Sequence, residues 1–540
     1  MSLDHPCVVT IDHRSRPRVL FSGTRLVEVD LPVGSRVVYP KQPLEGLPHP
    51  EAAVRYALNH PLGSEPLFAK LRPGMKVTIA IDDLSMPLPP MRRPDCRQMV
   101  IDAVLEMLKA YAVEDIHLII ATAFHRPMTS DEMRHIVGDK THRRFYPDRL
   151  YNHDAEKPNG LKYIGTSEHG IEVEINRRAA ESDLVIYVNL TFVPMNGGYK
   201  SMGTGLVGYR TLRGHHNPST IRKSESYMEP ERSYLNTKMV AVGKIIEDYV
   251  DVFHIETTVN NRMFGAPLDI LAENEDDLSD TEWAAMQGLV KTLKWLPQNA
   301  RQAIFEKVPA PYEMIAVAAG ACQPVHDHIL EACHKQLLVP IEGQADIGIF
   351  PIPYISPYNV GAFLNPVLVS VMAEGYLHNL HKGAPLVKKG GTMIILHPCS
   401  DKFDRHQHQA YAEFFHKLLP QTRDGLELHK RFEREFAKHP SYIQQYRSGK
   451  AYHPVHPFYM WYWGENGRQH RGRVIVVGAD NEYVPGILGY ETARTMEDAL
   501  RMARESAPED PSITCFRICP VVMADVTADP APPALTAEAE

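Results

Sequence analysis

A lysine and a histidine in the middle of the chain have the clearest chemical potential. Lys200 follows the pair Gly197-Gly198, and His216 lies sixteen residues further on. Paired glycines let the backbone approach a ligand closely, and a lysine amine placed there can bond covalently to a cofactor. Imidazole is a common ligand of transition metals. A covalent cofactor on Lys200 with His216 as a metal ligand is one interpretation, and a surface lysine with a solvated loop histidine is the alternative.

Two further polar groups follow apolar runs that are typical of buried strands. Asp82-Asp83 comes directly after residues 76–81, and His125 comes shortly after residues 116–121. In an open α/β sheet, ligands bind beyond the carboxyl ends of the strands, where we expect these side chains. His125 is therefore a candidate general base. Asp83 is either a functional carboxylate or a cap in a turn.

Other histidines and glycines carry weaker signals. The pairs His326–His328 and His406–His408 have metal-like spacing, but on a helix such residues point to different faces, so we interpret them as surface residues. His397 instead follows an apolar run and is expected to line a cleft. A formal G-x-G-x-x-G match at residues 203–208 follows its strand too late for a dinucleotide-binding turn. We interpret that match as a loop that approaches a ligand.

The elements that position these residues alternate between strand and helix. Apolar runs such as 184–193, 392–396 and 473–477 are separated by helix-like segments, which predicts an α/β protein with mainly parallel sheets. A chain of 540 residues is too long for one core. We therefore expect two α/β domains at 1–310 and 311–527. A helical insertion is expected within the first domain at residues 266–310, and a disordered tail at 528–540.

Composition excludes several classes of protein. The net charge of −8 is spread along the chain, which argues against nucleic acid or an anionic membrane as the main partner. The sequence contains no run of eighteen apolar residues, so we expect no membrane span. The first residues do not resemble a signal peptide. Seven scattered cysteines do not form a disulfide framework. We expect a cytoplasmic protein, and the sequence leaves open whether it forms a homo-oligomer.

Taken in order along the chain, these blocks resemble the nickel-pincer lactate racemase family. Residues 83–89 are similar to its D-x-x-R-P-x-P loop, and residues 121–132 to its A-T-G-F-H-R-P-x-T-x-x-E block. Residues 197–216 resemble its G-G-R-K-S segment and keep the lysine-to-histidine spacing. Residues 389–394 and 474–503 match as well. The His-Arg-Pro and Gly-Gly-x-Lys blocks together make the resemblance specific.

The resemblance implies two α/β domains around a cofactor-binding cleft. The cofactor is a nickel-pincer nucleotide (pyridinium-3,5-bisthiocarboxylic acid mononucleotide), which other enzymes synthesise and which binds nickel through sulfur, carbon and sulfur. One arm joins the lysine that matches Lys200, and the histidine that matches His216 completes the coordination of nickel. The histidine that matches His125, with Asp83, takes a hydroxyl proton while the carbon-bound hydrogen leaves as hydride. The implied cofactor-binding residues are Lys200, Gly197, Gly198, Asp83, Arg126 and Thr129.

Two departures from the family pattern bear on the substrate. Met86 stands where the family has an arginine, which removes a carboxylate clamp. Residues 189–196 lack the second base histidine that the family carries before the glycine pair. We therefore expect a larger hydroxylated small molecule than lactate, such as a sugar, sugar acid or polyol. The residues expected to contact it are Tyr358, Asn359, His397 and Trp461, and the candidates for the missing base are Glu465, His397, His453 and His456.

Three other readings remain open. Instead of a racemase or epimerase, the chain is in the first of these an oxidoreductase that uses the same cofactor. A metal-dependent hydrolase or lyase with a histidine/aspartate site would leave Lys200 unmodified. A non-catalytic member would bind the cofactor without turning over any substrate.

Overall fold

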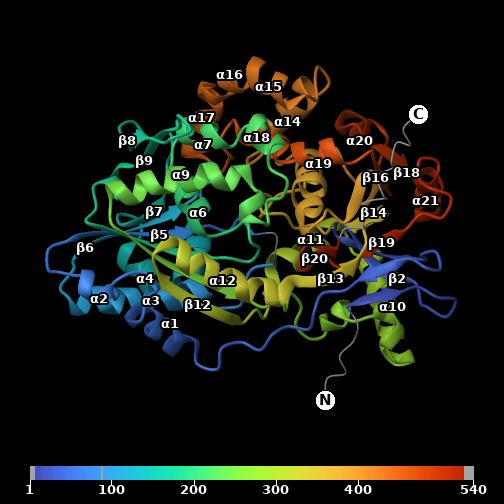
Figure 1. Cartoon of the computed structure of the whole chain (residues 1–540), viewed down its shortest axis with the longest axis horizontal. Helices are drawn as coiled ribbons and strands as arrows, with labels where there is room; N and C mark the ends of the chain where they lie inside the picture. The colour runs from blue at the N-terminus through green and yellow to red at the C-terminus, as the bar shows by residue number, and fades with distance from the viewer. Residues whose placement is uncertain (1–6, 87–88, 528–540) are drawn as a thin grey trace, which may run out of the picture.

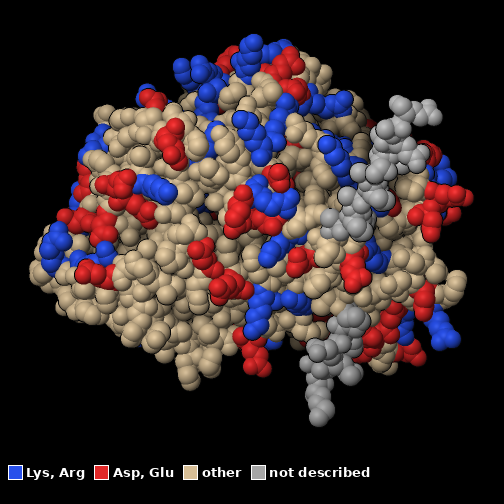
Figure 2. Space-filling model, viewed as in Figure 1, with Lys and Arg blue, Asp and Glu red and all other residues tan. Residues whose placement is uncertain are grey.

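The computed structural model describes residues 7–86 and 89–527 (Figure 1). The expected tail at 528–540 and Pro87-Leu88 of the Asp83 loop lie outside the described residues. Across the described part of the chain, no helix is long and apolar enough to cross a membrane. Lys and Arg side chains are interspersed with Asp and Glu on the face seen in Figure 2.

A first sheet of six strands occupies the left of Figure 1. Its order is β12 (Met314–Gly320), β11 (Val252–Val259), β10 (Leu184–Leu190), β5 (Lys76–Asp82), β6 (Asp115–Ala121) and β7 (Leu150–Asn152). All neighbours are parallel except β11 and β12. Every residue of the central strand β10 is buried, as expected for a parallel strand covered on both faces.

Helices cover both faces of this sheet. Successive side chains of β11 point to opposite faces, and each contacts a different set of helices. Thr257 contacts Cys96 of α3 (Cys96–Ala110), which packs with α1 (Pro50–Asn59) and α4 (Ser130–Phe145). Glu256 points to the opposite face, toward α12 (Cys322–Leu337) and α6 (Gly198–Gly205). The helix α9 (Tyr234–Tyr249) packs on α6.

A second sheet of seven strands lies to the right in Figure 1. Its order is β1 (Val8–Thr10), β4 (Arg36–Val38), β19 (Ile513–Phe516), β14 (Ala345–Pro351), β16 (Val387–Leu396), β17 (Arg473–Val477) and β18 (Glu491–Ala493). Only the β1–β4 pair is antiparallel. The prediction of an α/β fold with mainly parallel sheets is confirmed.

The sequence predicts a division of the chain at residue 310. The two sheets do not follow that division. β1 and β4, from the first forty residues, complete the second sheet, whereas β12 at residues 314–320 belongs to the first. Val37 of β4 pairs with Cys515 of β19. A three-residue strand carries no periodicity to read, so the sequence could not reveal this exchange. The chain therefore crosses between the two sheets twice.

The segment 266–310 holds α10 (Asp280–Trp295) and α11 (Gln298–Lys307). It is tied to the second sheet by Glu275, whose fully buried carboxylate receives a hydrogen bond from Tyr39 (2.6 Å) and pairs with Arg517 (2.6 Å). Removing one partner of such a buried ion pair costs several kcal/mol, about 3–5. The insertion is therefore fixed to the body of the protein.

Candidate active site

Asp83 and His125 meet at the carboxyl ends of neighbouring strands β5 and β6. His125 Nδ1 lies 2.8 Å from Asp83 Oδ2, and the amide of Ser85 donates to Asp83 Oδ1 (2.9 Å). Burial by itself would raise the pKa of Asp83, but His125 and the Ser85 hydrogen bonds hold it below its usual value. The carboxylate therefore holds His125 with Nδ1 protonated and leaves Nε2 for proton transfer.

The turn that presents His125 is strained. Ala123 has a φ of +50°, in the left-handed region where glycine is usual, and it stands where the block A-T-G-F-H-R has its glycine. The amide of His125 donates to Thr122 O (2.8 Å), which closes the turn. Strained non-glycine residues are frequent at functional sites.

The glycine pair before Lys200 is required by its surroundings. Both glycines have positive φ, and the amide of Gly198 donates to Glu256 Oε1 (2.5 Å). A Cβ on Gly197 would lie 2.2 Å from Thr191 Oγ1, and one on Gly198 would lie 2.8 Å from the ring of His326. Glu256 and His326 thus form the surface on which this turn rests, with His326 Nδ1 3.0 Å from Glu256 Oε2.

Lys200 projects from the first turn of α6 into a protein-lined space. Desolvation by the surrounding protein lowers the pKa of its amine to about 8, an effect that the nearby Asp82 carboxyl opposes. Burial raises the pKa of Asp82 to about 7. Lys200 Nζ lies 5.6 Å from the ring centroid of Trp463. An amine with this pKa is partly neutral near pH 7 and is therefore a nucleophile.

A chain of hydrogen bonds fixes the tautomer of His216. His215 Nε2 lies 3.0 Å from the carbonyl of Gly203, so Nε2 is its protonated nitrogen and Nδ1 is an acceptor. His216 Nδ1, 2.7 Å away, must then donate to His215 Nδ1, which leaves the lone pair of His216 on Nε2. Burial lowers the pKa of His215 to about 3 and holds that of His216 well below its usual value, so both rings are neutral. A neutral imidazole oriented through its second nitrogen is suited to bind a metal.

These groups line one continuous cavity. Two adjoining hollows of about 80 Å³ each share six lining residues: Ser85, Ala123, His125, Asn196, Lys200 and Thr204. Asp82 and Asp83 line one end, and His216 lines the other. The structure therefore brings together His125, Asp83, Gly197, Lys200 and His216.

The helix α18 (His456–Trp463) closes the cavity from the C-terminal part of the chain. His456, Tyr459, Met460 and Trp463 line the cavity at i, i+3, i+4 and i+7, the spacing of one helical face. Trp461 lies on another face, where Nε1 donates to Arg423 O (3.0 Å) and the guanidinium of Arg468 covers the ring at 4.1 Å. Trp463 therefore lines the cavity, and the predicted Trp461 does not.

His456 is the one candidate for the missing base that borders this cavity. Its Nδ1 is hydrogen-bonded to the hydroxyl of Tyr411, whereas its buried Nε2 has no hydrogen-bond partner. The rings of His456 and His125 are 5.3 Å apart between centroids. Burial, reinforced by neighbouring histidines, keeps the pKa of His456 well below its usual value. A buried imidazole nitrogen without a hydrogen-bond partner is uncommon in a protein interior.

The other three candidates are occupied elsewhere. His397 Nδ1 accepts from the amide of Cys399 (2.9 Å), and the ring packs near Gly23. His453 pairs with Glu156 (3.1 Å), and Glu465 pairs with Arg222 (2.6 Å). The predicted contact of His397 with substrate is therefore not seen at this cavity.

The remaining predicted site residues divide in the same way. Tyr358 lines the cavity, with its hydroxyl 3.0 Å from that of Tyr376. Asn359 instead holds its own loop, accepting from Ser356 N (2.7 Å).

Arg126 and Thr129 serve the start of α4. Arg126 forms two hydrogen bonds to Glu132, and Thr129 caps α4 through the capping box predicted by the spacing of Thr129 and Glu132. These contacts occupy the Arg126 guanidinium with a carboxylate of the protein.

Sequence reasoning missed the groups that support the site. His326 was interpreted as a surface residue, yet it is largely buried against Glu256. The spacing of these residues did carry a signal for their convergence. Cys322 and His326 are one helical turn apart, and His254 and Glu256, two residues apart, point to the same face of a strand. Tyr411 carried no signal beyond its residue type, whereas Asp82 belongs to the Asp82-Asp83 pair that follows a predicted buried strand.

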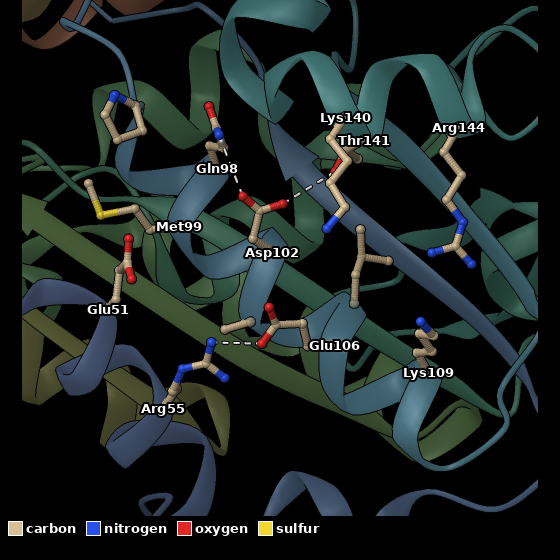
Figure 3. A pocket seen from close by; sticks show the side chains of 13 residues that line it. Glu51, Arg55, Gln98, Met99, Asp102, Glu106, Lys109, Lys140, Thr141 and Arg144 are labelled. Carbon is tan, nitrogen blue, oxygen red and sulfur yellow. Dashed lines mark hydrogen bonds and ion pairs between the residues drawn. The ribbon is translucent and has the colours of Figure 1, made fainter.

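A separate polar groove of about 500 Å³ lies between α1, α3 and α4 (Figure 3). Its side chains pair with one another, as Arg55 does with Glu106 (2.7 Å), and Asp102 accepts from Gln98. None of its lining residues borders the Lys200 cavity. We assign no chemistry to this groove.

Comparison with known proteins supports the resemblance found in the sequence. Residues 23–229 match the lactate racemase N-terminal domain. The lactate racemase of Lactiplantibacillus plantarum is 25% identical over 181 residues, which are 33% of this chain and 40% of that protein. The lactate racemase of Thermoanaerobacterium thermosaccharolyticum is 25% identical over 177 residues, 32% of this chain and 39% of that protein. The match thus spans about two fifths of these curated relatives.

Solved structures extend the likeness to the whole fold. The lactate racemase apoprotein from Thermoanaerobacterium thermosaccharolyticum superposes with a TM-score of 0.62 at 18% identity, covering 94% of this chain and 99% of that one. A protein from Thermotoga maritima superposes with a TM-score of 0.51 at 15% identity, covering 90% of this chain and 100% of that one. The chain therefore shares the fold of the lactate racemase apoprotein, and its residues 23–229 match the lactate racemase N-terminal domain.

Proposed function

We propose that the protein is a racemase or epimerase that acts at a hydroxyl-bearing carbon with a nickel-pincer nucleotide held by Lys200 and His216. One observation carries the proposal: a nucleophilic amine, a neutral imidazole with a free lone pair and a carboxylate-oriented histidine line one cavity. The family's nickel chemistry requires these three groups together.

The residues present fit the group. The amine of Lys200 can form the thioamide, because its pKa of about 8 leaves a neutral fraction. The relay through His215 directs the lone pair of His216 to Nε2, as a nickel ligand requires. When bound, the group supplies an acceptor and donor of hydride for the substrate carbon.

The protein's own residues then manage the proton. Asp83 holds Nδ1 of His125, so that Nε2 of His125 accepts the proton of the substrate hydroxyl. His456 borders the same cavity, and Tyr411 holds its Nδ1. Inversion at a carbon requires a proton-transfer group on each face of the substrate. His125 serves one face, and His456 is our candidate for the other.

The lining favours a polyhydroxylated substrate larger than lactate. The guanidinium of Arg97, which borders the cavity beside Met86, is already bound to Asp95 (2.8 and 2.9 Å) and to two backbone carbonyls. Tyr358, Tyr459 and Trp463 supply aromatic surface, which suits the face of a sugar ring. We therefore propose a sugar, sugar acid or polyol rather than lactate.

The experiment that tests the cofactor uses intact mass and nickel content. Protein made together with the cofactor-synthesis enzymes should carry a nickel-containing adduct that maps to Lys200. The adduct should be absent from Lys200→Ala and present in Lys223→Ala, a matched change at an exposed lysine. An unmodified wild-type chain that gains activity on addition of zinc would overturn the proposal in favour of a hydrolase or lyase.

The second proton-transfer group is tested separately. His456→Gln should keep the Lys200 adduct but lower turnover about 100-fold, the usual loss for a general acid or base. Tyr411→Phe should lower turnover less and shift the pH profile, because it removes only the hydrogen bond to Nδ1. Unchanged turnover in His456→Gln would exclude His456 from proton transfer.

A further inference from the structure

A second cluster of metal-binding side chains lies outside the Lys200 cavity. Glu247, His254 and Cys322 each place one potential ligand atom within 4.8 Å of the others. They come from three elements, because Glu247 ends α9, His254 lies on β11 and Cys322 begins α12. His254 and Cys322 are buried, and Glu247 is partly buried.

Secondary-structure periodicity explains why these residues converge. His254 and Glu256 point to the same face of β11, since strand side chains alternate. Cys322 and His326 lie one turn apart on α12 and face that strand. The contact of Glu256 with His326 (3.0 Å) fixes the helix against the strand, which sets His254 and Cys322 opposite one another.

The hydrogen bonding of the cluster is incomplete. His254 is fully buried, and its Nδ1 has no partner. Its Nε2 lies 2.7 Å from Met202 Sδ, a poor hydrogen-bond acceptor. Glu247 receives one hydrogen bond, from the hydroxyl of Tyr199 (2.9 Å), and Cys322 is not in a disulfide. A ring with neither nitrogen well satisfied is costly in a protein interior.

The donor set has the chemistry of a zinc site. A thiolate, an imidazole and a carboxylate are the side-chain ligands that Zn²⁺ takes in proteins. Burial lowers the pKa of His254 to about 4, which keeps its lone pair available. Burial raises the pKa of Cys322 well above its usual value, and a divalent cation reverses this preference by stabilising the thiolate.

We propose that Glu247, His254 and Cys322 bind one zinc-type divalent cation, with the thiol of Cys322 releasing its proton to solvent. Met202 of α6, beside His254, or a water molecule completes the coordination. The ion would join α9, β11 and α12 next to α6, the helix that carries Lys200. The site is separate from the nickel site and does not depend on the proposed function.

The test is the metal content of the full chain made without the cofactor-synthesis enzymes. After dialysis against a weak chelator, wild-type protein should hold roughly one zinc per chain. Lys200→Ala should hold the same amount, whereas Cys322→Ser and His254→Gln should each lose at least tenfold. Cys333→Ser is the matched control, because Cys333 is a buried thiol on the same helix that lies near Phe192 O (3.2 Å); it should retain zinc.

Cobalt substitution keeps the proposal testable if a variant does not fold. Wild-type protein stripped of metal and given Co²⁺ should show a near-ultraviolet thiolate-to-cobalt band. Wild-type protein with neither bound zinc nor this band would overturn the proposal, as would full zinc content in folded Cys322→Ser. Failure of the nickel proposal is read independently, from the mass at Lys200.

Discussion

Two carboxylate–histidine pairs close to Lys200 have nearly the same geometry and different tasks. His125 Nδ1 lies 2.8 Å from Asp83, and His326 Nδ1 lies 3.0 Å from Glu256. Glu256 also accepts from Gly198 N and Thr191 Oγ1, so its oxygens are fully used in holding the glycine turn. Asp83 orients a histidine whose other nitrogen borders the cavity.

The difference shows that the role of such a pair is set by its remaining partners. The Glu256 side chain is 0% exposed and that of His326 13%, compared with 8% for Asp83 and 20% for His125. The more enclosed pair supports the backbone beneath Lys200. The more open pair is available to a substrate, as a general base must be.

The largest expected effect comes from the open pair. His125→Gln should lower turnover by about 100- to 10,000-fold, because it removes the base and leaves the fold intact. Steady-state kinetics should show this loss while the mass of the Lys200 adduct is unchanged. His169→Gln, at a histidine that does not line the cavity, serves as the control. A loss of adduct in His125→Gln would mean that the pair is structural, like Glu256–His326.

A substitution in the Glu256–His326 pair should change the stability of the fold and not the turnover. Glu256→Gln should reduce the free energy of unfolding by about 3 kcal/mol, because His326 loses its charged partner inside the protein. Urea denaturation measures this change. Asp251→Asn, which breaks the exposed pair with Lys70, should cost less than about 1 kcal/mol. Equal losses in the two variants would contradict the assigned structural role of Glu256.

The same pair should give stability a defined dependence on pH. Burial would lower the pKa of His326, but Glu256 raises it above 6.5, so its contribution is complete below pH 6.5 and is lost as pH rises through the raised value. Burial would raise the pKa of Glu256, but His326 lowers it below 4.5, so its contribution is complete above pH 4.5 and is lost as pH falls through the lowered value.

The pair therefore contributes fully between pH 4.5 and 6.5. His326→Gln should flatten the decline of stability on the alkaline side, as measured by melting temperature against pH. A decline of the same size in His326→Gln and wild type would assign it to other groups.

The smallest expected effect concerns the turn before His125. Ala123→Gly should raise the free energy of unfolding by about 1 kcal/mol, because glycine adopts a φ of +50° without strain. Denaturant unfolding of the variant and of Ala121→Gly, a strand position with ordinary φ that should lose stability, checks the sign. A loss of stability in Ala123→Gly would mean that its methyl group packs more favourably than the strain costs.

Several site residues could be placed from the sequence because local patterns specify them. The runs before Asp83 and His125 are long buried strands, and parallel strands end at one edge, so the two side chains meet. Thr129 and Glu132 predicted their capping box because that contact is local. His326, Glu256 and His456 were not placed, since their partners lie between 45 and 331 residues away in the chain.

The sequence alone determined the class of fold, the glycine turn with its lysine, and the histidine sixteen residues beyond it. These follow from hydrophobic periodicity and from the conformational freedom of glycine, which act over a few residues. The tertiary structure decided which of four candidate groups faces His125 and which of two tryptophans lines the cavity. It also decided that the first strands complete the second sheet. These outcomes depend on long-range packing of buried surfaces, which no local pattern encodes.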